Sequence, residues 1–433
     1  MAPVPLSAGE RAGRRRAAWV LGLVVALALA GRLAFALTRP AAVAGDEVSY
    51  LNCARNVVAG HGFVFTPPHA VLSFFLPPAF PAFLVPFAAA FPPDHLARAV
   101  AIAHAFLGAA TAALAWATAR RFANPLAGAV AGVAVAVHPY ITYYSSQLLT
   151  ETLALFFLAL FLFLYLKDDA GPARLAAAGA VAALAALTRP VFLYPALAGV
   201  AALLLVGRDV PARRRAARAA IMLAAFGVVL APWAARNYRL SGRPILVTYA
   251  MGTVLYQTNA PIAHDPSAPT LWEVAETPAY RAYLKTKPPT DVARELAFQD
   301  YLSARARAII RAHPGEFARL CGRRLLHTFA LYPSYASTIP MTPRLKLGTA
   351  LTASYMTLLF AAALVGFFLL PSRSPRAALF LPTAVVLITA VHVVTIALLR
   401  YRLPTDLLLC ITASVGVGVS CDKLRRRAAG SPK

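Results

Sequence analysis

The side chains best suited to chemistry are carboxylates and guanidinium groups that lie just outside long apolar stretches of the sequence. They are Asp46, Glu47, Glu151, Arg189, Arg400 and Arg402. A carboxylate can take the proton from an attacking hydroxyl or coordinate a divalent ion, and an arginine binds phosphate oxygens in a planar fork. If these groups converge, they suit a substrate with a lipid tail, an anionic phosphate and a polar group to be transferred.

Each of these residues also has a simpler structural interpretation. Asp46 and Glu47 are adjacent, so their side chains diverge on a helix or strand, and at most one of them points into a given site. The other would orient a neighbour or cap the helix that begins near Val48. Glu151 follows Thr150 at the start of an apolar stretch and could cap a helix in the same way. The arginines could simply extend from a membrane to its surface.

The composition shows what kind of protein positions these groups. Of 433 residues, 59% are hydrophobic and 14% are charged, whereas soluble domains have roughly 45–50% apolar and about 25% charged residues. An ordinary soluble enzyme and a disordered chain are both excluded. The net charge of +25 could indicate nucleic-acid binding, but the basic residues lie between long apolar stretches, which indicates a membrane surface instead.

Apolar stretches long enough for transmembrane helices predict an all-α polytopic membrane protein with about ten spans. They cover residues 17–37, 97–119, 125–141, 150–166, 173–188, 190–206, 219–235, 347–370, 377–399 and 403–420. A further apolar stretch, 71–91, contains four prolines. Because proline removes a backbone donor and breaks regular helix, we predict a re-entrant or interfacial segment there.

The distribution of basic residues predicts which side each loop faces. With the N-terminus inside, the short cytoplasmic loops and tails hold 20 Lys or Arg and five Asp or Glu, as the positive-inside rule requires. Both termini are then cytoplasmic, and the first apolar stretch is an uncleaved helix rather than a signal peptide.

This topology leaves two large segments on the outer face. The first outer loop, 38–96, lies within an N-terminal transmembrane module, 1–235. The second segment, 236–346, is predicted to be a small periplasmic subdomain, in which 290–312 has helical spacing after a Thr-Asp start. Residues 347–433 are predicted to form the C-terminal transmembrane helices and a basic tail.

No nucleotide-binding signature accompanies this architecture. The sequence has no GxxxxGK[ST] loop and no GxGxxG after a predicted strand. Because ATP is absent outside the cytoplasm, the energy for a transfer at the outer face would have to arrive with a lipid-linked phosphate.

Several short motifs follow one another along the chain, namely GDEVSY at 45–50, ARN at 54–56, GHGF at 60–63, LPPAFP at 76–81, QLLTE at 147–151, ALTRP at 186–190, ARNY at 235–238, GRP at 242–244 and RYRLP at 400–404. In this order they resemble the motifs of C-type (GT-C) glycosyltransferases, and in particular of the dolichyl-phosphate-mannose protein mannosyltransferase family (glycosyltransferase family 39 and relatives). The resemblance implies a GT-C bundle in the bacterial inner membrane with its active site on the periplasmic side.

The resemblance also implies an activity and roles for residues. The activity is inverting sugar transfer from a polyprenyl-phosphate donor to a hydroxyl of a glycan, lipid or protein. The carboxylates would be catalytic, with Asp46 as base or metal ligand, Glu47 as its neighbouring acid and Glu151 near the acceptor. The substrate-binding residues would be Tyr50, Arg55, Arg189, Arg400 and Arg402. Whether Asp46 binds a divalent cation is left open. No nucleic-acid partner is expected.

A transporter or flippase of lipid-linked glycans is the alternative from another class of protein. It would share the many spans, but it more often has broken helices and charges near the middle of the bilayer. Here the charged residues gather at the outer boundary, which favours an enzyme. Cys53 and Cys321 both fall on the predicted outer face, where an oxidising environment would permit a disulfide.

Overall fold

The computed structural model describes residues 7–66, 71–167, 170–207, 210–263, 273–332 and 343–428. Within these ranges the regular elements are helices, and the only β pairing is an isolated bridge between Phe65 and Leu72. The predicted all-α class is therefore confirmed. All four cysteines are free thiols, so the disulfide between Cys53 and Cys321 is not formed.

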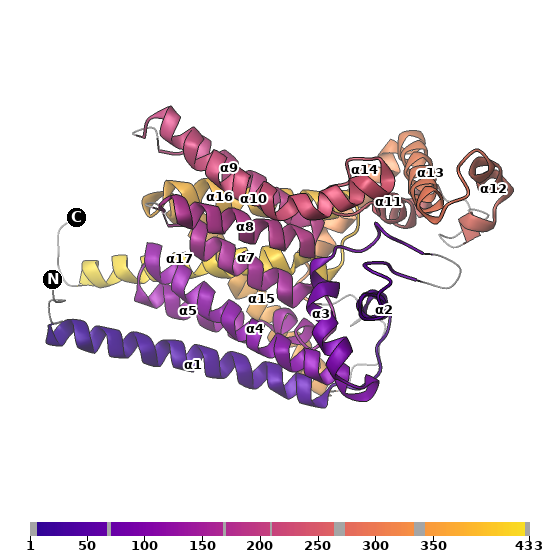
Figure 1. Ribbon diagram of the computed structural model, residues 1–433. Coiled ribbons are helices and arrows are strands. Elements are labelled where there is room, and N and C mark those ends of the chain that lie inside the picture. Colours follow the sequence, from indigo (N-terminus) through magenta and orange to yellow (C-terminus); the bar gives the residue numbers. More distant parts are fainter. Residues whose placement is uncertain are drawn as a thin grey trace.

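Ten helices, each at one of the ten predicted spans, run alongside one another in a bundle (Figure 1). They are α1 (Ala8–Thr38), α4 (Pro93–Phe122), α5 (Pro125–Val137), α7 (Glu151–Tyr165), α8 (Pro172–Thr188), α9 (Leu193–Leu205), α10 (Ala212–Ser241), α15 (Pro343–Leu369), α16 (Pro375–Val394) and α17 (Leu403–Ala428). In the described part of the chain, six are long and apolar enough to cross a membrane, namely α1, α4, α10, α15, α16 and α17. The other four are apolar but only 13 to 17 residues long.

The start of α1 and the end of α17 lie at the same end of this bundle (Figure 1). Basic side chains gather there around the C-terminal end of α7. Arg121 donates to the Phe163 carbonyl at 3.2 Å, and Arg376 donates to those of Tyr165 and Lys167 at 3.2 and 2.9 Å. These cations stabilise the negative end of a helix dipole. The opposite end of the bundle, at the start of α7, is called the far end below.

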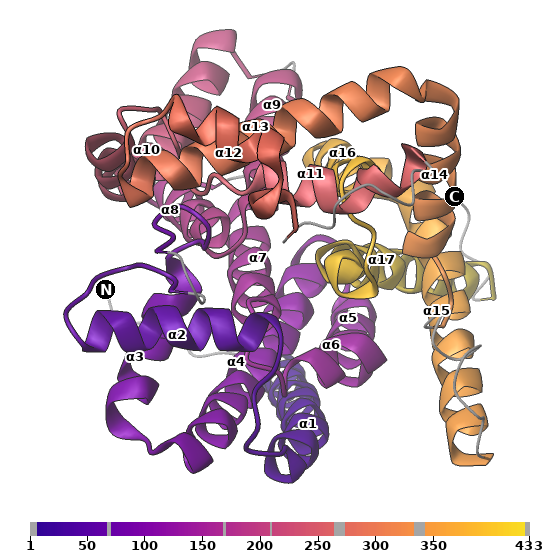
Figure 2. The same ribbon diagram turned by 90° about the vertical axis from the view of Figure 1, so that its right-hand side faces the viewer.

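Two short helices, α2 (Asp46–Val58) and α3 (Ala79–Ala90), lie across the far end rather than along the bundle (Figures 1 and 2). The proline-rich stretch 71–91 thus forms one short helix, which starts after Pro78 and contains Pro86. Its buried face includes Phe80 and Leu84, which pack with Leu51 of α2. Apolar packing therefore fixes α2 to the end of the bundle.

Four further helices gather at the far end beyond the bundle (Figure 1). They are α11 (Met251–Asn259), α12 (Pro278–Lys285), α13 (Asp291–Ala312) and α14 (Pro314–Thr328). The helix predicted at 290–312 is α13, and its cap is Thr290, whose hydroxyl accepts from the Ala293 amide at 3.2 Å. α10, for its part, continues past residue 235 to Ser241.

Two glycines allow α15 and α17 to pack with their backbones in contact. A Cβ added at Gly366 would lie 2.0 Å from the Thr412 carbonyl oxygen, and one at Gly416 would lie 2.5 Å from that of Ala362. Small residues at such crossings are the usual means of close helix packing in membranes. α17 therefore packs tightly against α15. The segment that carries Arg400 directly precedes α17 in the chain.

The helix α13 contacts the segment between α2 and α3 through one buried carboxylate. Glu295 accepts hydrogen bonds from the backbone amides of Ser73 at 2.7 Å and Phe74 at 2.9 Å. Arg236, at the end of α10, donates to the Ser73 carbonyl at 2.7 Å and to that of Phe63 at 3.0 Å. These contacts fix the loop that leads into α3.

Burial raises the pKa of Glu295 to about 7, so we expect this contact to depend on pH. Docking raises the pKa of the carboxyl, and the docked state therefore holds more protons than the undocked state between about pH 4.5 and 7. The contact is strongest below that range and weakens as pH rises through 7, by about tenfold per pH unit at most. Limited proteolysis of the loop should be faster at pH 8 than at pH 6. Equal rates, or a Glu295→Gln variant with an unchanged pH dependence, would contradict this assignment.

Candidate active site

Four of the charged residues singled out in the sequence converge at the far end of the bundle. Asp46 and Glu151 are the first residues of α2 and α7, and Arg189 is the residue between α8 and the following 3-10 turn. Arg400 lies in η6, the 3-10 turn Leu399–Arg402 that precedes α17. The four come from segments far apart in the sequence, which is typical of a site rather than of a local cap.

Local sequence explains why these residues stand where they do. Gly45, just before α2, has φ = 57°, a conformation that glycine adopts without strain, and it turns the chain so that Asp46 begins a helix. Pro190 disfavours helical conformation at the preceding residue, so α8 ends and Arg189 adopts extended backbone. Its side chain is thereby directed at α7.

Asp46 is the carboxylate of the site that is open to solvent. Its Oδ2 accepts from Arg400 Nη2 at 2.5 Å, and its side chain is 53% exposed whereas that of Arg400 is 20% exposed. Arg400 Nε also lies 3.9 Å from Glu151 Oε1. Arg400 therefore stands between the two carboxylates.

Glu151 is the buried counterpart, with a side chain 3% exposed. Its Oε1 accepts from Arg189 Nη1 at 2.6 Å, and Arg189 also donates to the Thr150 hydroxyl at 3.2 Å. Thr150 makes no side-chain cap to α7. The contacts of Glu151 are thus made across the bundle, which favours a role in the site over simple capping.

The aromatic ring of Tyr401 contacts the guanidinium groups of both arginines. The Tyr401 ring centroid lies 4.8 Å from the guanidinium carbon of Arg189 and 5.0 Å from that of Arg400. The His392 ring stacks on Tyr401 with centroids 5.3 Å apart. Cation–π contacts of this kind attract a guanidinium group to the face of an aromatic ring, so Tyr401 holds the two arginines side by side.

Tyr50, one turn after Asp46 on α2, completes the group. Burial raises the pKa of its hydroxyl above the ordinary value, and the surrounding charges of Arg189, Glu151, Asp46 and Arg400 modify it further. The ring packs edge-on against Phe80 with centroids 5.2 Å apart. Tyr50 therefore lies at the site as a neutral hydroxyl.

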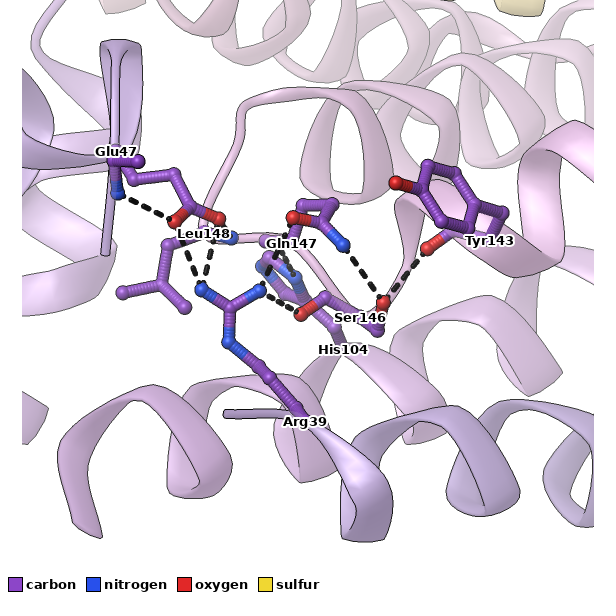
Figure 3. A network of polar contacts seen from close by, with 8 residues as sticks. Arg39, Glu47, His104, Tyr143, Ser146, Gln147 and Leu148 are labelled. Atoms are coloured by element: carbon purple, nitrogen blue, oxygen red, sulfur yellow. Dashed lines mark hydrogen bonds and ion pairs between the residues drawn. The ribbon is translucent and has the colours of Figure 1, made fainter. Parts of the chain in front are cut away.

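The side chains of the neighbouring residues Glu47 and Asp46 have different partners. The Glu47 side chain is buried and pairs with Arg39, a residue that the sequence analysis did not single out (Figure 3). A signal for Arg39 was present: it directly follows the first span on the side that the positive-inside rule leaves poor in basic residues.

Two of the predicted substrate-binding arginines lie elsewhere. Arg402 is 1% exposed and points into the bundle, where it pairs with Asp406 at 3.0 Å. Arg55 is exposed on α2 and makes no ion pair or side-chain hydrogen bond with any described residue. The geometry thus supports Arg189 and Arg400 as anion-binding candidates, and gives no such support to Arg402 or Arg55.

The donor set near Asp46 fits an anion better than a cation. The described residues contain no group of three or more His, Cys, Asp and Glu side chains that could hold a metal ion. The partner of Asp46 is the guanidinium of Arg400. What the site offers is one exposed carboxylate as proton acceptor and two arginines in contact with a single aromatic ring.

The fold is similar to that of a membrane oligosaccharyltransferase of known structure. The structure resembles that of the oligosaccharyltransferase AglB from Archaeoglobus fulgidus in complex with an inhibitory peptide and a dolichol-phosphate, with a TM-score of 0.56, 15% identity and coverage of 96% of this chain. An oligosaccharyltransferase from the same organism, tethered to an acceptor peptide, gives a TM-score of 0.58 at 12% identity and coverage of 96% of this chain. The chain spans about half the length of these two structures, 52% and 51%.

Residues 76–234 match the family model of dolichyl-phosphate-mannose-protein mannosyltransferases. The match confirms, for this segment, the family resemblance predicted from the sequence motifs, and it includes Glu151 and Arg189. ArnT from Cupriavidus metallidurans bound to undecaprenyl phosphate gives a TM-score of 0.43 at 18% identity, covering 94% of this chain and 79% of its own. No protein of curated function matches the sequence.

Proposed function

We propose that this multi-pass membrane protein is a glycosyltransferase that moves a sugar from a polyprenyl-phosphate donor to a hydroxyl of a glycan, lipid or protein. The observation that carries the proposal is the pair formed by Asp46, an exposed carboxylate, and Arg400, a half-buried arginine, at the end of a bundle of apolar helices. The bundle suits the polyprenyl chain, and Arg400 and Arg189 suit the phosphate.

In this proposal, the Asp46 carboxylate takes the proton from the acceptor hydroxyl while the hydroxyl oxygen attacks the anomeric carbon of the sugar. The bond from that carbon to the phosphate oxygen breaks, and the electron pair leaves with the polyprenyl phosphate. Arg400 and Arg189 stabilise the charge that develops on the leaving phosphate. Glu151 holds Arg189 in place through its buried ion pair.

We place this reaction at the periplasmic face of the bacterial inner membrane. The far end, where the site lies, is opposite the start of α1 and the end of α17 (Figure 1). Arg121 and Arg376 lie at that opposite end, beside the C-terminal end of α7, and basic residues favour the cytoplasmic side. A polyprenyl-phosphate sugar carries its own leaving group, so the proposed reaction requires no ATP at this face.

A transfer assay tests the proposal. Purified protein in detergent, given radiolabelled polyprenyl-phosphate sugars and total membrane glycolipids, should label an acceptor. The same sugars as nucleotide conjugates should give no product. Transfer from nucleotide sugars, or movement of lipid-linked glycans across vesicles without transfer, would overturn the proposal, and the second result would identify a flippase.

A further inference from the structure

We infer that Arg39 and Glu47 are a positioning pair that fixes the proposed catalytic carboxylate, Asp46, relative to Glu151. The inference rests on the proposed function, because it concerns how that site is held together. Neither side chain reaches the cluster formed by Asp46, Arg400, Glu151 and Arg189, and both act through the backbone.

Arg39 joins the end of the first span to the start of α2. It is the C-cap residue of α1, and its Nη2 donates to both carboxylate oxygens of Glu47 at 2.9 Å. The side chains of Arg39 and Glu47 are only 5% and 9% exposed. The ion pair is therefore held in one geometry, unlike a pair at the surface.

The same two residues bind the turn that precedes α7. Arg39 Nη1 donates to the Ser146 carbonyl at 2.6 Å and to Gln147 Oε1 at 3.2 Å. Glu47 Oε1 accepts from the Leu148 amide at 2.9 Å. Figure 3 shows these contacts converging from two sides on the turn 145–148.

A third helix, α4, also contacts the turn 145–148. His104 of α4 places Nδ1 3.1 Å from the Gln147 carbonyl oxygen, and its ring stacks on Phe83 with centroids 5.5 Å apart. The turn is thus held by α1, α2 and α4 together, and it leads within three residues to Glu151.

Position along the chain makes this network a connection between the two carboxylates. Glu47 is the direct neighbour of Asp46, and Leu148 stands three residues before Glu151. A hydrogen bond between Glu47 and the Leu148 amide therefore ties the start of α2 to the start of α7. Because Asp46 itself is half exposed, packing around its own side chain does not set its position.

The chemistry of the pair favours positioning over stability alone. Taking two charges out of water costs free energy that their attraction often fails to repay, and apolar residues of similar size serve stability equally well. Hydrogen bonds within and around an ion pair instead fix the orientation of its side chains. Both Glu47 carboxylate oxygens and both Arg39 Nη atoms have hydrogen-bond partners here.

The chain offers a matched control on the same helix. Arg32 is also a buried arginine of α1, and it donates to the carbonyls of Val135 at 3.0 Å and Ala136 at 3.1 Å. Those carbonyls lie in the last turn of α5, and within the described residues the hydrogen bonds of Arg32 go to neither the turn 145–148 nor the charged cluster. Arg32→Met should thus disturb the bundle without disturbing the link between α2 and α7.

The test variant is the double substitution Arg39→Met with Glu47→Gln, because removing one charge alone would leave its partner buried and unpaired. We expect this variant to fold with a melting temperature close to that of the wild type. Its kcat should fall by about 10²-fold, the scale expected for a misplacement of roughly 1 Å. Its KM for the donor should be unchanged, since Arg189 and Arg400 are intact. Arg32→Met should lower the melting temperature and leave kcat within a few-fold.

A measurement without substrate makes the test independent of the activity. Spin labels at Val58→Cys on α2 and Tyr143→Cys beside the turn, both exposed positions, should give one narrow distance distribution in the parent protein. The double variant should broaden it, and Arg32→Met should not. Cys321 and Cys421 would be serine in all of these proteins.

The possible outcomes distinguish a failure of the positioning role from a failure of the proposed function. A double variant that keeps wild-type kcat and a narrow distance distribution overturns the positioning role. Equal loss of kcat in Arg32→Met also overturns it, because any disturbance of α1 would then suffice. If the parent protein transfers no sugar at all, the proposed function fails, and the distance distributions alone decide whether the pair fixes α2 against α7.

Discussion

Asp46→Asn is expected to lower sugar transfer by at least about a hundredfold, since a positioned general base contributes roughly 10²–10⁴-fold. The same substitution should not weaken the binding of polyprenyl phosphate, and we expect several-fold tighter binding. In the free protein, Arg400 is paired with Asp46 at 2.5 Å, so a phosphate must compete with this carboxylate. Asparagine keeps the shape of the side chain and removes the competing charge.

Rates of transfer and binding of a fluorescent polyprenyl phosphate, measured on the same preparations, check both parts. Asp94→Asn is a suitable control, because Asp94 is also an exposed acid in the first turn of a helix and has no place in the site. Loss of both transfer and binding in Asp46→Asn would instead indicate that Asp46 holds the donor, for example through a cation. Full transfer by the variant would remove Asp46 from the chemistry.

The helices themselves were predictable because their signals are local. A helix forms at each of the ten continuous apolar stretches, and six of these helices, in the described part of the chain, are long enough to span a membrane. The helix 290–312 follows from its spacing and its threonine cap. The prolines in 71–91 predict a re-entrant or interfacial segment, and this stretch forms the short helix α3 across the end of the bundle.

The site was only partly predictable, because it depends on where side chains point. Arg400 and Arg402 are two residues apart and look equivalent in the sequence, but on a 3-10 turn with three residues per turn they face different directions. One meets Asp46 and the other meets Asp406. Nothing local distinguishes them, since the partners lie hundreds of residues away in one case and in the next helical turn in the other. For Arg39 a local signal was present, its place directly after the first span, but its partners Glu47 and the turn 145–148 are set by the fold.

The contrast between these two arginines gives the second large prediction. Arg402→Met should destabilise the protein by about 3–5 kcal/mol, the cost of leaving one charge of a buried pair without its partner. Asp406 is fully buried, and its carboxylate oxygens lie 3.0 and 3.1 Å from Arg402 Nε. Arg402 also donates to the carbonyls of Thr328 at 2.8 Å and Ala330 at 2.7 Å, so its loss would free the end of α14.

Thermal unfolding in detergent, compared across three variants, distinguishes this structural role from donor binding. Arg402→Met should lose most of its folded population, and adding Asp406→Leu should restore much of it, because a buried pair replaced by apolar residues is often neutral. Arg400→Gln should melt near the wild type, since its partner is half exposed and such pairs contribute little, but it should raise the KM for the donor. If Arg402→Met instead melts normally and loses donor affinity, the side chain must reach the phosphate. The family resemblance would then describe its role better than the buried pair with Asp406 does.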